Sequence, residues 1–150
     1  MVKLTKDINC GHSSVVERLV ANEKVEGSNP FARSINYMSE LYKKKCIPCK
    51  GNIPPFDLSE IHKYLKQIDG WNVKSTLDKS YFLEKDFKFD DFIRSQTFIN
   101  EVCDISEQEG HHPDILFGWG YAKIKIFTHS IKGLAESDFI LASKIDRIKT

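Results

Sequence analysis

The spacing of hydrophobic residues along the chain predicts three amphipathic helices. In each helical segment apolar side chains recur every three or four residues, which places them on one face of a helix. The segments are Leu58–Ile68, Phe92–Glu109 and Ala135–Ile148. The residues expected to face inward are Leu58, Ile61, Leu65 and Ile68 in the first helix, Phe92, Ile99, Val102 and Ile105 in the second, and Phe139, Ala142 and Ile145 in the third.

Polar residues and glycines at the ends of these segments mark the same helices. Asp57 precedes the first helix and Glu60 follows three residues later, which is a capping-box pattern. Asp90 or Asp91 can cap the second helix, and Gly110 ends it.

Alternation of apolar and polar residues predicts four β-strands. The first begins at Trp71, and the second carries four apolar residues of one parity, interrupted by Lys85. Ile115–Trp119 and Tyr121–Thr128 are expected to form a hairpin. The apolar residues of one parity are Tyr81, Leu83, Phe87 and Phe89 in the second strand, and Ala122, Ile124 and Ile126 in the last.

The order of these elements predicts an α+β fold, a four-stranded antiparallel sheet with helices packed on one face. The regular pattern covers residues 38–150, a length sufficient for one domain with a core. Residues 1–37 depart from it, because the turn residues Gly27–Pro30 have no partner element. We expect residues 1–37 to be a disordered N-terminal extension or a non-native read-through, with Met38 as the natural start; a genuine partner-binding arm is the alternative.

Composition and charge narrow the classes of function. With 22 basic and 21 acidic residues the formal net charge is +1, so electrostatics gives no reason to expect nucleic acid as a direct partner. No apolar run approaches the roughly 20 residues that span a bilayer, and no segment resembles a secretory signal. We therefore expect a cytoplasmic protein without a membrane partner.

Cys46 and Cys49 form a C-x-x-C motif, which occurs in redox pairs and in zinc sites. A tetrahedral zinc site needs two more ligands, and no second cysteine pair lies nearby. We therefore favour reduced cysteines in a flexible lead-in; a metal-binding or thiol redox protein is the alternative.

Three of the five histidines lie between positions 111 and 129, and they are the main candidates for chemistry. His111 and His112 directly follow the second helix, and Pro113 restricts the backbone after them. His129 lies at the far end of a strand that we expect to pair with the strand after Pro113. Imidazole has an ordinary pKa of about 6.5 and exchanges protons near neutral pH. These three side chains therefore suit general acid–base catalysis.

Two other uses of these histidines stay open. Each could be an ordinary polar surface residue, as we expect for His62, which lies off the hydrophobic stripe of its helix. They could also bind zinc, although adjacent histidines diverge, unlike the i, i+4 pair of a metal-binding helix. Glu107 lies one turn before His111 and could accept a hydrogen bond from it or ligate a metal.

The segment from Glu107 to Asp138 resembles the signature of pterin-4a-carbinolamine dehydratases. The shared pattern is Glu-x-x-x-His-His-Pro, a strand ending in Thr-His, a Gly-Leu pair and an Asp that opens the last helix. The similarity continues upstream through residues 87–92 and 70–71 and covers residues 38–147. The matching residues are Glu107, His111, His112, Pro113, Thr128, His129, Gly133, Leu134 and Asp138.

This resemblance implies a dehydratase that converts a 4a-hydroxytetrahydropterin into a quinonoid dihydropterin, in tetrahydrobiopterin recycling, without a metal or organic cofactor. It implies that His111 and His129 are candidate acids for the leaving hydroxyl, while His112 orients the pterin or acts as a base. Asp138 would hold His129 or a neighbouring backbone group, or would simply be a first-turn helix carboxylate. The residues implied to bind substrate are Gly110, Pro113, Thr128, Ser130, Asp138 and Glu107.

The resemblance also implies a homo-oligomer, a dimer or a tetramer, and leaves a second function open. Some family members act as dimerisation cofactors or assembly chaperones, so a non-catalytic binding module is the alternative. The intact histidine triplet favours the enzyme, because a scaffold would not need it. One departure from the family is Ala135, where members usually carry Ser or Thr; this removes a helix N-cap worth about 1 kcal/mol.

Overall fold

The computed structural model describes residues 40–47 and 53–149, so the expected extension 1–37 and Cys49 lie outside the described residues. Nine elements occur in the described part. In chain order they are the 3₁₀-helix η1 (Glu40–Lys43), helix α1 (Leu58–Leu65), strands β1 (Asn72–Ser75) and β2 (Tyr81–Lys88), helix α2 (Phe92–Glu109), strands β3 (Asp114–Gly118) and β4 (Tyr121–Ile126), the 3₁₀-helix η2 (His129–Ile131) and helix α3 (Glu136–Ile145).

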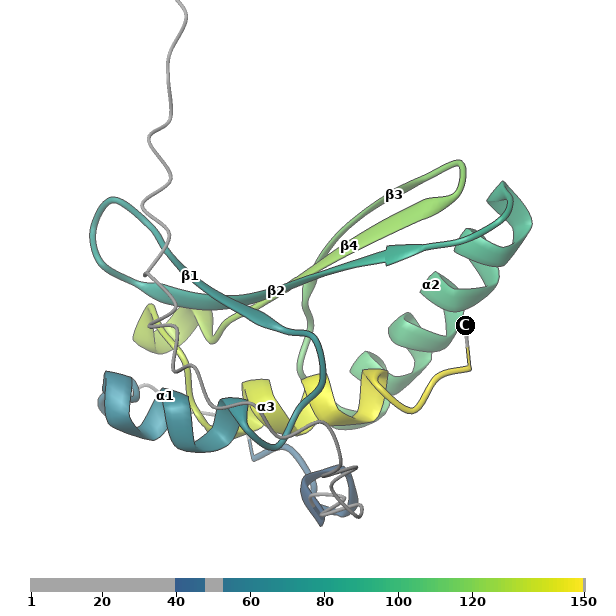
Figure 1. Ribbon diagram of the computed structural model, residues 1–150. Helices are drawn as coiled ribbons and strands as arrows, with labels where there is room; N and C mark the ends of the chain where they lie inside the picture. Colours follow the sequence, from purple (N-terminus) through teal and green to yellow (C-terminus); the bar gives the residue numbers. More distant parts are fainter. Residues whose placement is uncertain (1–39, 48–52, 150) are drawn as a thin grey trace, which may run out of the picture.

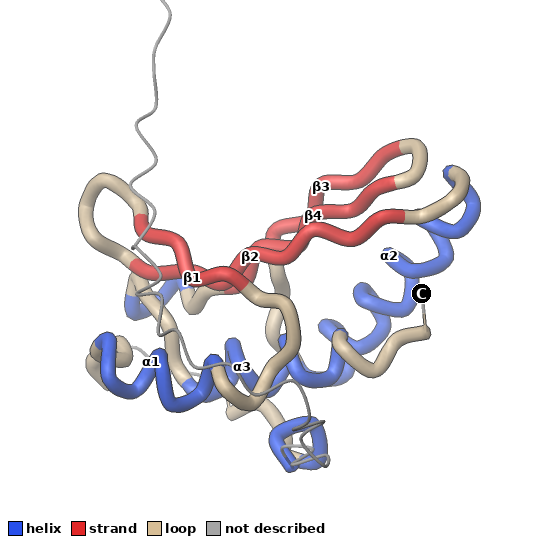
Figure 2. The backbone as a smooth tube through the Cα atoms, in the orientation of Figure 1, coloured by secondary structure: helices blue, strands red, loops and turns tan. Residues whose placement is uncertain are grey.

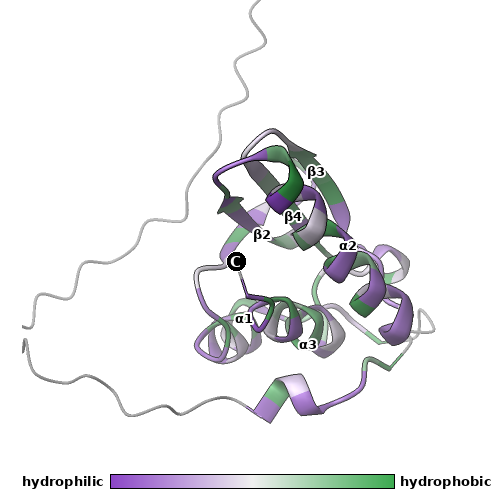
Figure 3. Ribbon diagram, turned by 90° about the vertical axis from the view of Figure 1, so that its right-hand side faces the viewer, coloured by the Kyte–Doolittle hydropathy of each residue, from purple (hydrophilic) through white to green (hydrophobic). Residues whose placement is uncertain are grey.

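The strands form one antiparallel sheet in the order β1-β2-β4-β3. Helices α1, α2 and α3 lie on the same side of this sheet (Figures 1 and 2), and a view turned by 90° shows them together below the strands (Figure 3). The predicted α+β fold, with helices on one face, is therefore confirmed. Strand β3, which follows the paired histidines, is an edge strand of the sheet.

The hydrophobic core lies between the sheet and the helices. Leu83, Ile124 and Ile126 of the sheet have no exposed surface, and neither do Val102 of α2 and Phe139 of α3. Full burial of a side chain of this kind stabilises the fold by roughly 1.5–3 kcal/mol. This packing fixes α2 and α3, the two helices that flank the histidine segments, against the sheet.

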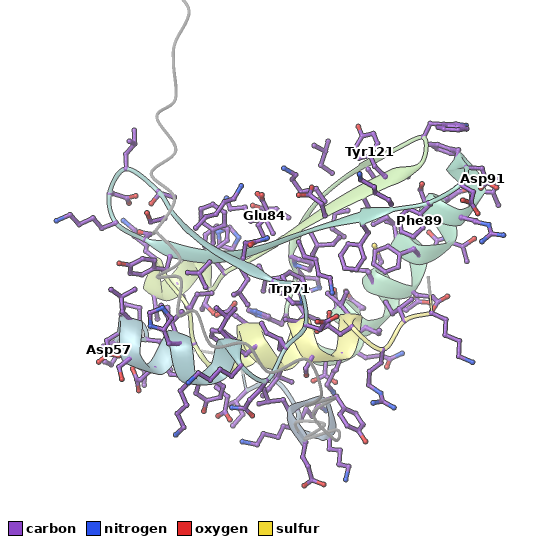
Figure 4. All side chains as sticks on the ribbon, viewed as in Figure 1. Asp57, Trp71, Glu84, Phe89, Asp91 and Tyr121 are labelled. Carbon is purple, nitrogen blue, oxygen red and sulfur yellow. The ribbon has the colours of Figure 1, made fainter. Side chains whose placement is uncertain are left out.

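Side chains alternate between the two faces of the sheet, as their parity predicts. Trp71 and Phe89 lie on the helix side, whereas Glu84 and Tyr121 lie on the opposite face (Figure 4). The opposite face carries ion pairs across strands, such as that between Lys74 and Glu84, with Nζ and Oε1 2.8 Å apart. One face is therefore apolar and the other charged.

Lys85, which interrupts the apolar parity of β2, points to the helix side and is paired there. Its Nζ lies 2.7 Å from Oδ1 of Asp146, just after α3, and 2.6 Å from the carbonyl oxygen of Asp69. The same Asp146 oxygen accepts the indole N–H of Trp71 at 2.9 Å. Because a buried charge is costly without partners, this cluster lets a lysine occupy an inward position.

Some predicted details were wrong at the helix ends. Leu58 and Phe92, predicted to face inward, are 44% and 42% exposed, because each is the first residue of its helix, at the edge of the helix layer. The Phe92 ring instead stacks on that of Phe117, with centroids 6.0 Å apart. Helices α1 and α3 end three residues earlier than predicted, since the backbone continues as turns with hydrogen bonds to the third residue before.

Candidate active site

Asp138 is the one carboxylate that is fully buried among the described residues. Burying a carboxylate costs several kcal/mol unless hydrogen-bond donors replace water. Three donors surround this one: Nε2 of His111 at 2.8 Å from Oδ1, and, at Oδ2, the hydroxyl of Thr128 at 2.9 Å and the backbone N–H of Ala135 at 2.7 Å. The buried carboxylate is thus fully satisfied.

Each partner of Asp138 comes from a different part of the chain. Asp138 stands in the first turn of α3, where its bond to the N–H of Ala135 forms one half of a capping box. The other half is missing, because Ala135 has no side-chain acceptor, as the sequence predicts. Thr128 follows β4 and His111 follows α2, so the carboxylate joins three elements at one point.

The hydrogen bond to Asp138 determines what the His111 ring can do. A carboxylate only accepts hydrogen bonds, so the proton lies on Nε2 of His111. Nδ1 is then the nitrogen that can accept a proton from a ligand, or deliver one when the ring is charged. The side chain is 15% exposed, which gives that nitrogen a path to a small molecule.

The backbone of His111 is tied to the end of α2. Gly110 adopts a left-handed conformation with φ of 62°, which favours glycine, and ends the helix as predicted. The N–H of His111 donates to the carbonyl of Ser106 at 3.1 Å. His111 is therefore bonded to the last turn of α2, whereas Asp138 belongs to the first turn of α3.

His112 and Glu107 form an exposed pair, with Nε2 and Oε2 3.0 Å apart and side chains 64% and 84% exposed. Glu107 therefore bonds His112 and not His111, which corrects the expected pairing. The reason is geometric, because the Nε2 of His111 is directed at Asp138. A surface pair of this kind is worth about 1 kcal/mol or less, so Glu107 constrains His112 only weakly.

His129 packs on Phe127 and not on Asp138, so of the two partners expected for Asp138 the structure gives the neighbouring backbone group, the N–H of Ala135. The ring centroids are 4.1 Å apart and the ring planes meet at 46°. The ammonium of Lys125 lies 4.6 Å from the centroid of the Phe127 ring. His129 is exposed, so its ring is accessible to a ligand while Phe127 supports it from one side.

Strand pairing brings the two histidine segments to the same end of the hairpin, as predicted. Asp114 of β3 pairs with Lys125 of β4, so the residues before Asp114 face the residues after Lys125. His111 and Thr128 consequently both reach Asp138. The three histidine rings nevertheless have three different partners, one buried carboxylate, one exposed carboxylate and one aromatic ring.

The remaining residues of the predicted site lie in the same two segments. Gly110 and Ser130 are exposed and Pro113 is half-buried. Thr128 is buried, and its hydroxyl supports Asp138 from the interior.

Sequence reasoning did not identify Phe127 and Glu109 as part of the site. Phe127 occupies an outward position of the β4 alternation, where Lys123 and Lys125 precede it, and an aromatic residue there was the available signal. Glu109 bonds residues far away in the chain, Cys46 and Lys144, and no local pattern announces such contacts.

Two features of the described segments bear on the cysteine and metal alternatives. There, no group of three or more His, Cys, Asp and Glu side chains could hold a metal ion. Cys46 is buried, and its thiol donates to the carbonyl of Ser137 at 3.4 Å. Burial, with the nearby Glu109 carboxylate, raises the pKa of this thiol to about 12. Such a thiol is a poor nucleophile at neutral pH.

One surface cavity of about 400 Å³ lies elsewhere, between the end of β2 and the first half of α2. None of the three candidate histidines lines it. The residues that line the cavity are Lys88, Phe89, Asp90, Ile93, Arg94, Thr97, Phe98, Glu101 and Lys149.

In the described part of the chain, no helix combines the length and the apolar character required to cross a membrane.

A family model described as pterin 4 alpha carbinolamine dehydratase matches residues 54–148. Relatives from Rubrobacter xylanophilus and Rickettsia bellii are 45% identical over 111 residues and 46% identical over 110 residues. These matches cover 74% and 73% of this chain and 100% and 94% of the relatives. Both relatives bear the name "Putative pterin-4-alpha-carbinolamine dehydratase".

The chain is also similar to a solved structure, a transcriptional coactivator/pterin dehydratase from Brucella melitensis. The TM-score is 0.55 at 27% identity, and the match covers 61% of this chain and 94% of the other.

Proposed function

The chain belongs to the pterin-4α-carbinolamine dehydratase family, and on that basis we propose that it dehydrates a 4a-hydroxytetrahydropterin to the quinonoid dihydropterin. In this reaction the C4a–O bond breaks and the hydroxyl leaves as water after it takes up a proton. N5 loses its proton, and a double bond forms between C4a and N5. The reaction would serve the recycling of tetrahydrobiopterin.

The observation that carries this proposal is the hydrogen bond between His111 and the buried Asp138. It keeps the proton on Nε2 and leaves Nδ1 for exchange with the substrate. With a charged ring, Nδ1–H can protonate the departing hydroxyl; with a neutral ring, Nδ1 can accept the proton of N5. General acid–base catalysis of this kind contributes a factor of about 10²–10⁴ to the rate.

We assign the other histidines to the same reaction. His111 and His129 are the candidate acids for the hydroxyl, and His112 orients the pterin or acts as the base. The exposure of His112 and His129 supports this assignment, since both rings can reach a ligand from solvent. Gly110, Pro113 and Ser130 would line the bound pterin, and Thr128 and Asp138 would support it from the interior.

Stopped-flow dehydration of chemically generated 4a-hydroxytetrahydropterin tests the proposal. We expect H111A and H129A to lower kcat by about a hundredfold each, the scale of one general acid. H62A is the matched control, because His62 is also an exposed histidine but stands on α1. Equal rates for wild type, H111A and H129A, or an equal loss in H62A, would refute the catalytic assignment.

A binding role is the second candidate, since the name of the Brucella melitensis protein combines a transcriptional coactivator with a pterin dehydratase. A wild-type chain that folds but does not accelerate dehydration would favour this role. We also propose that the protein is a cytoplasmic homo-oligomer, a dimer or tetramer, whose direct partners include neither nucleic acid nor membrane. The open edge of β3, with the exposed Leu116 and Phe117, supports assembly.

A further inference from the structure

The segment Glu40–Ile47, which precedes the residues matched by the family model, 54–148, contacts the end of α2. The backbone N–H of Cys46 donates to Oε2 of Glu109, the last residue of α2, at 2.8 Å. The other oxygen, Oε1, accepts from Nζ of Lys144 on α3 at 2.6 Å. Glu109 and Lys144 are only 11% and 19% exposed. One carboxylate thus joins the N-terminal segment, α2 and α3.

The same segment contacts the first turn of α3. The hydroxyl of Ser137 donates to the carbonyl of Ile47 at 3.0 Å, and the thiol of Cys46 donates to the carbonyl of Ser137 at 3.4 Å. Lys44 pairs with Glu136, with Nζ and Oε1 2.6 Å apart. Three contacts therefore hold Glu40–Ile47 against the start of α3.

Both sets of contacts adjoin the His111–Asp138 pair in the chain. Glu109 is two residues before His111, and the bond from His111 N–H to the Ser106 carbonyl joins His111 to the same helical turn. Ser137 directly precedes Asp138. The distance between His111 and Asp138 depends on how the end of α2 sits relative to the start of α3, which is where Glu40–Ile47 connects the two helices.

We propose that Glu40–Ile47 is a positioning strap, which acts through Glu109 and Ser137 to hold His111 at the distance from Asp138 that catalysis requires. This inference rests on the proposed dehydratase function for its kinetic consequence. Its structural consequence is that the segment keeps the His111–Asp138 hydrogen bond in one fixed geometry, and this consequence does not depend on the reaction.

The charge of Glu109 is stabilised by the two groups that this carboxylate connects. Burial disfavours the charged carboxylate, but the hydrogen bonds from Lys144 and from the Cys46 N–H hold the pKa of Glu109 below its usual value. Removal of one member of a buried ion pair leaves the other charge without a partner, and neighbouring groups then move to solvate it.

The test compares E109Q with D146N. Glutamine keeps the size of Glu109 and loses its charge, so the strap and Lys144 are both weakened. Asp146 is the matched control, because its pair with Lys85 is buried to a similar degree, with side chains 14% and 16% exposed, but lies at the far end of α3. Two readouts are measured in the full-length protein: the hydrogen-bonded Nε2–H signal of His111 by NMR, and kcat and KM for dehydration.

We expect E109Q to broaden the His111 Nε2–H signal and to lower kcat about tenfold with KM unchanged, which is the cost of a sub-ångström misplacement. D146N should leave the signal and kcat as in wild type while lowering thermal stability. A wild-type signal in E109Q, or an equal effect in D146N, would overturn the proposal. If E109Q does not fold, S137A takes its place, since it loses one neutral hydrogen bond and should broaden the same signal; an unchanged signal would overturn the strap.

The two proposals fail in different ways. If the wild-type protein does not catalyse dehydration, the proposed function is wrong, and the NMR comparison of E109Q with D146N still decides whether the strap orders His111.

Discussion

At the scale of single residues, one buried carboxylate has two structural roles. One oxygen of Asp138 accepts from the start of α3 and from Thr128, and the other accepts from His111. The helix and the histidine are therefore supported by the same group. A change at this position should affect stability and activity together.

D138N tests this double role. Asparagine places an NH₂ group where one carboxylate oxygen stood, so at least one of the three donors around it is left without an acceptor. We expect the free energy of unfolding to fall by about 1–3 kcal/mol and kcat to fall by at least about a hundredfold, because Nε2 of His111 loses the acceptor that fixes its proton. Urea unfolding and stopped-flow kinetics measure the two effects.

The control for D138N is D114N, on an exposed aspartate of β3 whose Oδ2 lies 3.5 Å from Nζ of Lys125. This exposed pair should change stability by less than about 1 kcal/mol. Activity in D138N equal to that in D114N would contradict the role given to Asp138.

The thiol of Cys46 predicts a pH dependence of stability. In the unfolded chain a thiol loses its proton near the reference pKa of 9.0, whereas in the folded protein burial raises the pKa to about 12. Above pH 9 the unfolded state therefore binds fewer protons than the folded state, and stability falls as pH rises from 9 towards 12. The slope from this group is at most about 1.4 kcal/mol per pH unit.

C46A isolates this effect, because alanine removes the thiol and keeps the backbone N–H that bonds Glu109. Urea unfolding between pH 8 and pH 10.5 should show a steeper loss of stability in wild type than in C46A. Parallel curves would mean that the folded thiol titrates like the unfolded one.

At the scale of elements, the start of α3 is incompletely capped. Ala135 has an extended backbone with φ of −137° and ψ of 175°, the conformation of an N-cap residue, but no oxygen to offer. A135S would supply a hydroxyl that can accept an N–H of the first turn. We expect the free energy of unfolding to rise by about 1 kcal/mol.

D57A provides the reverse comparison, since Asp57 makes the complete capping box of α1 with Glu60. D57A should lower the free energy of unfolding by about 1 kcal/mol, the amount by which A135S is expected to raise it. Thermal unfolding of both variants measures the two values, and a loss of stability in A135S would show that the buried position has no room for the hydroxyl.

Local patterns were sufficient to predict the elements and some of their ends, but not the burial of the first residue of a helix. The capping box at Asp57, the end of α2 at Glu109 and the inward parity of β2 were all predicted, because each depends on residues within a few positions. Leu58 and Phe92 were placed inward wrongly, since periodicity cannot distinguish the first turn of a helix from its middle. The inward position of Lys85 is explained only by its contact with Asp146, which lies 61 positions further along the chain, just after α3.

The same limit applies to the candidate site. Sequence motifs selected the three histidines and Asp138, and strand pairing confirmed that their segments meet. The partner of each ring was predicted less well: Asp138 contacts His111 across 27 positions of the chain. That contact depends on how α3 packs beneath the sheet, which no local period encodes.

At the scale of the whole molecule, the edge of the sheet is the feature that bears on assembly. Among the described strands, β3 pairs on one side only, and its Leu116 is 59% exposed. We expect light scattering of the purified protein to give the mass of a dimer or tetramer, and L116K to reduce that mass, because an edge lysine disfavours contact between sheets.

L77K is the matched control for this prediction, as Leu77 is a fully exposed leucine in the turn between β1 and β2. It should assemble like wild type. A monomeric wild-type protein would contradict the expected oligomer. An unaltered mass in L116K would show that Leu116 of β3 does not contribute to assembly.

The cluster of Lys85, Asp146 and Trp71 also constrains how this sequence can diverge. A substitution at Lys85 alone leaves an inward carboxylate without its cation, and one at Asp146 alone strands the ammonium beside two aromatic rings. Related sequences should therefore carry both charges or neither, and replacement of only one of the two residues should be rare.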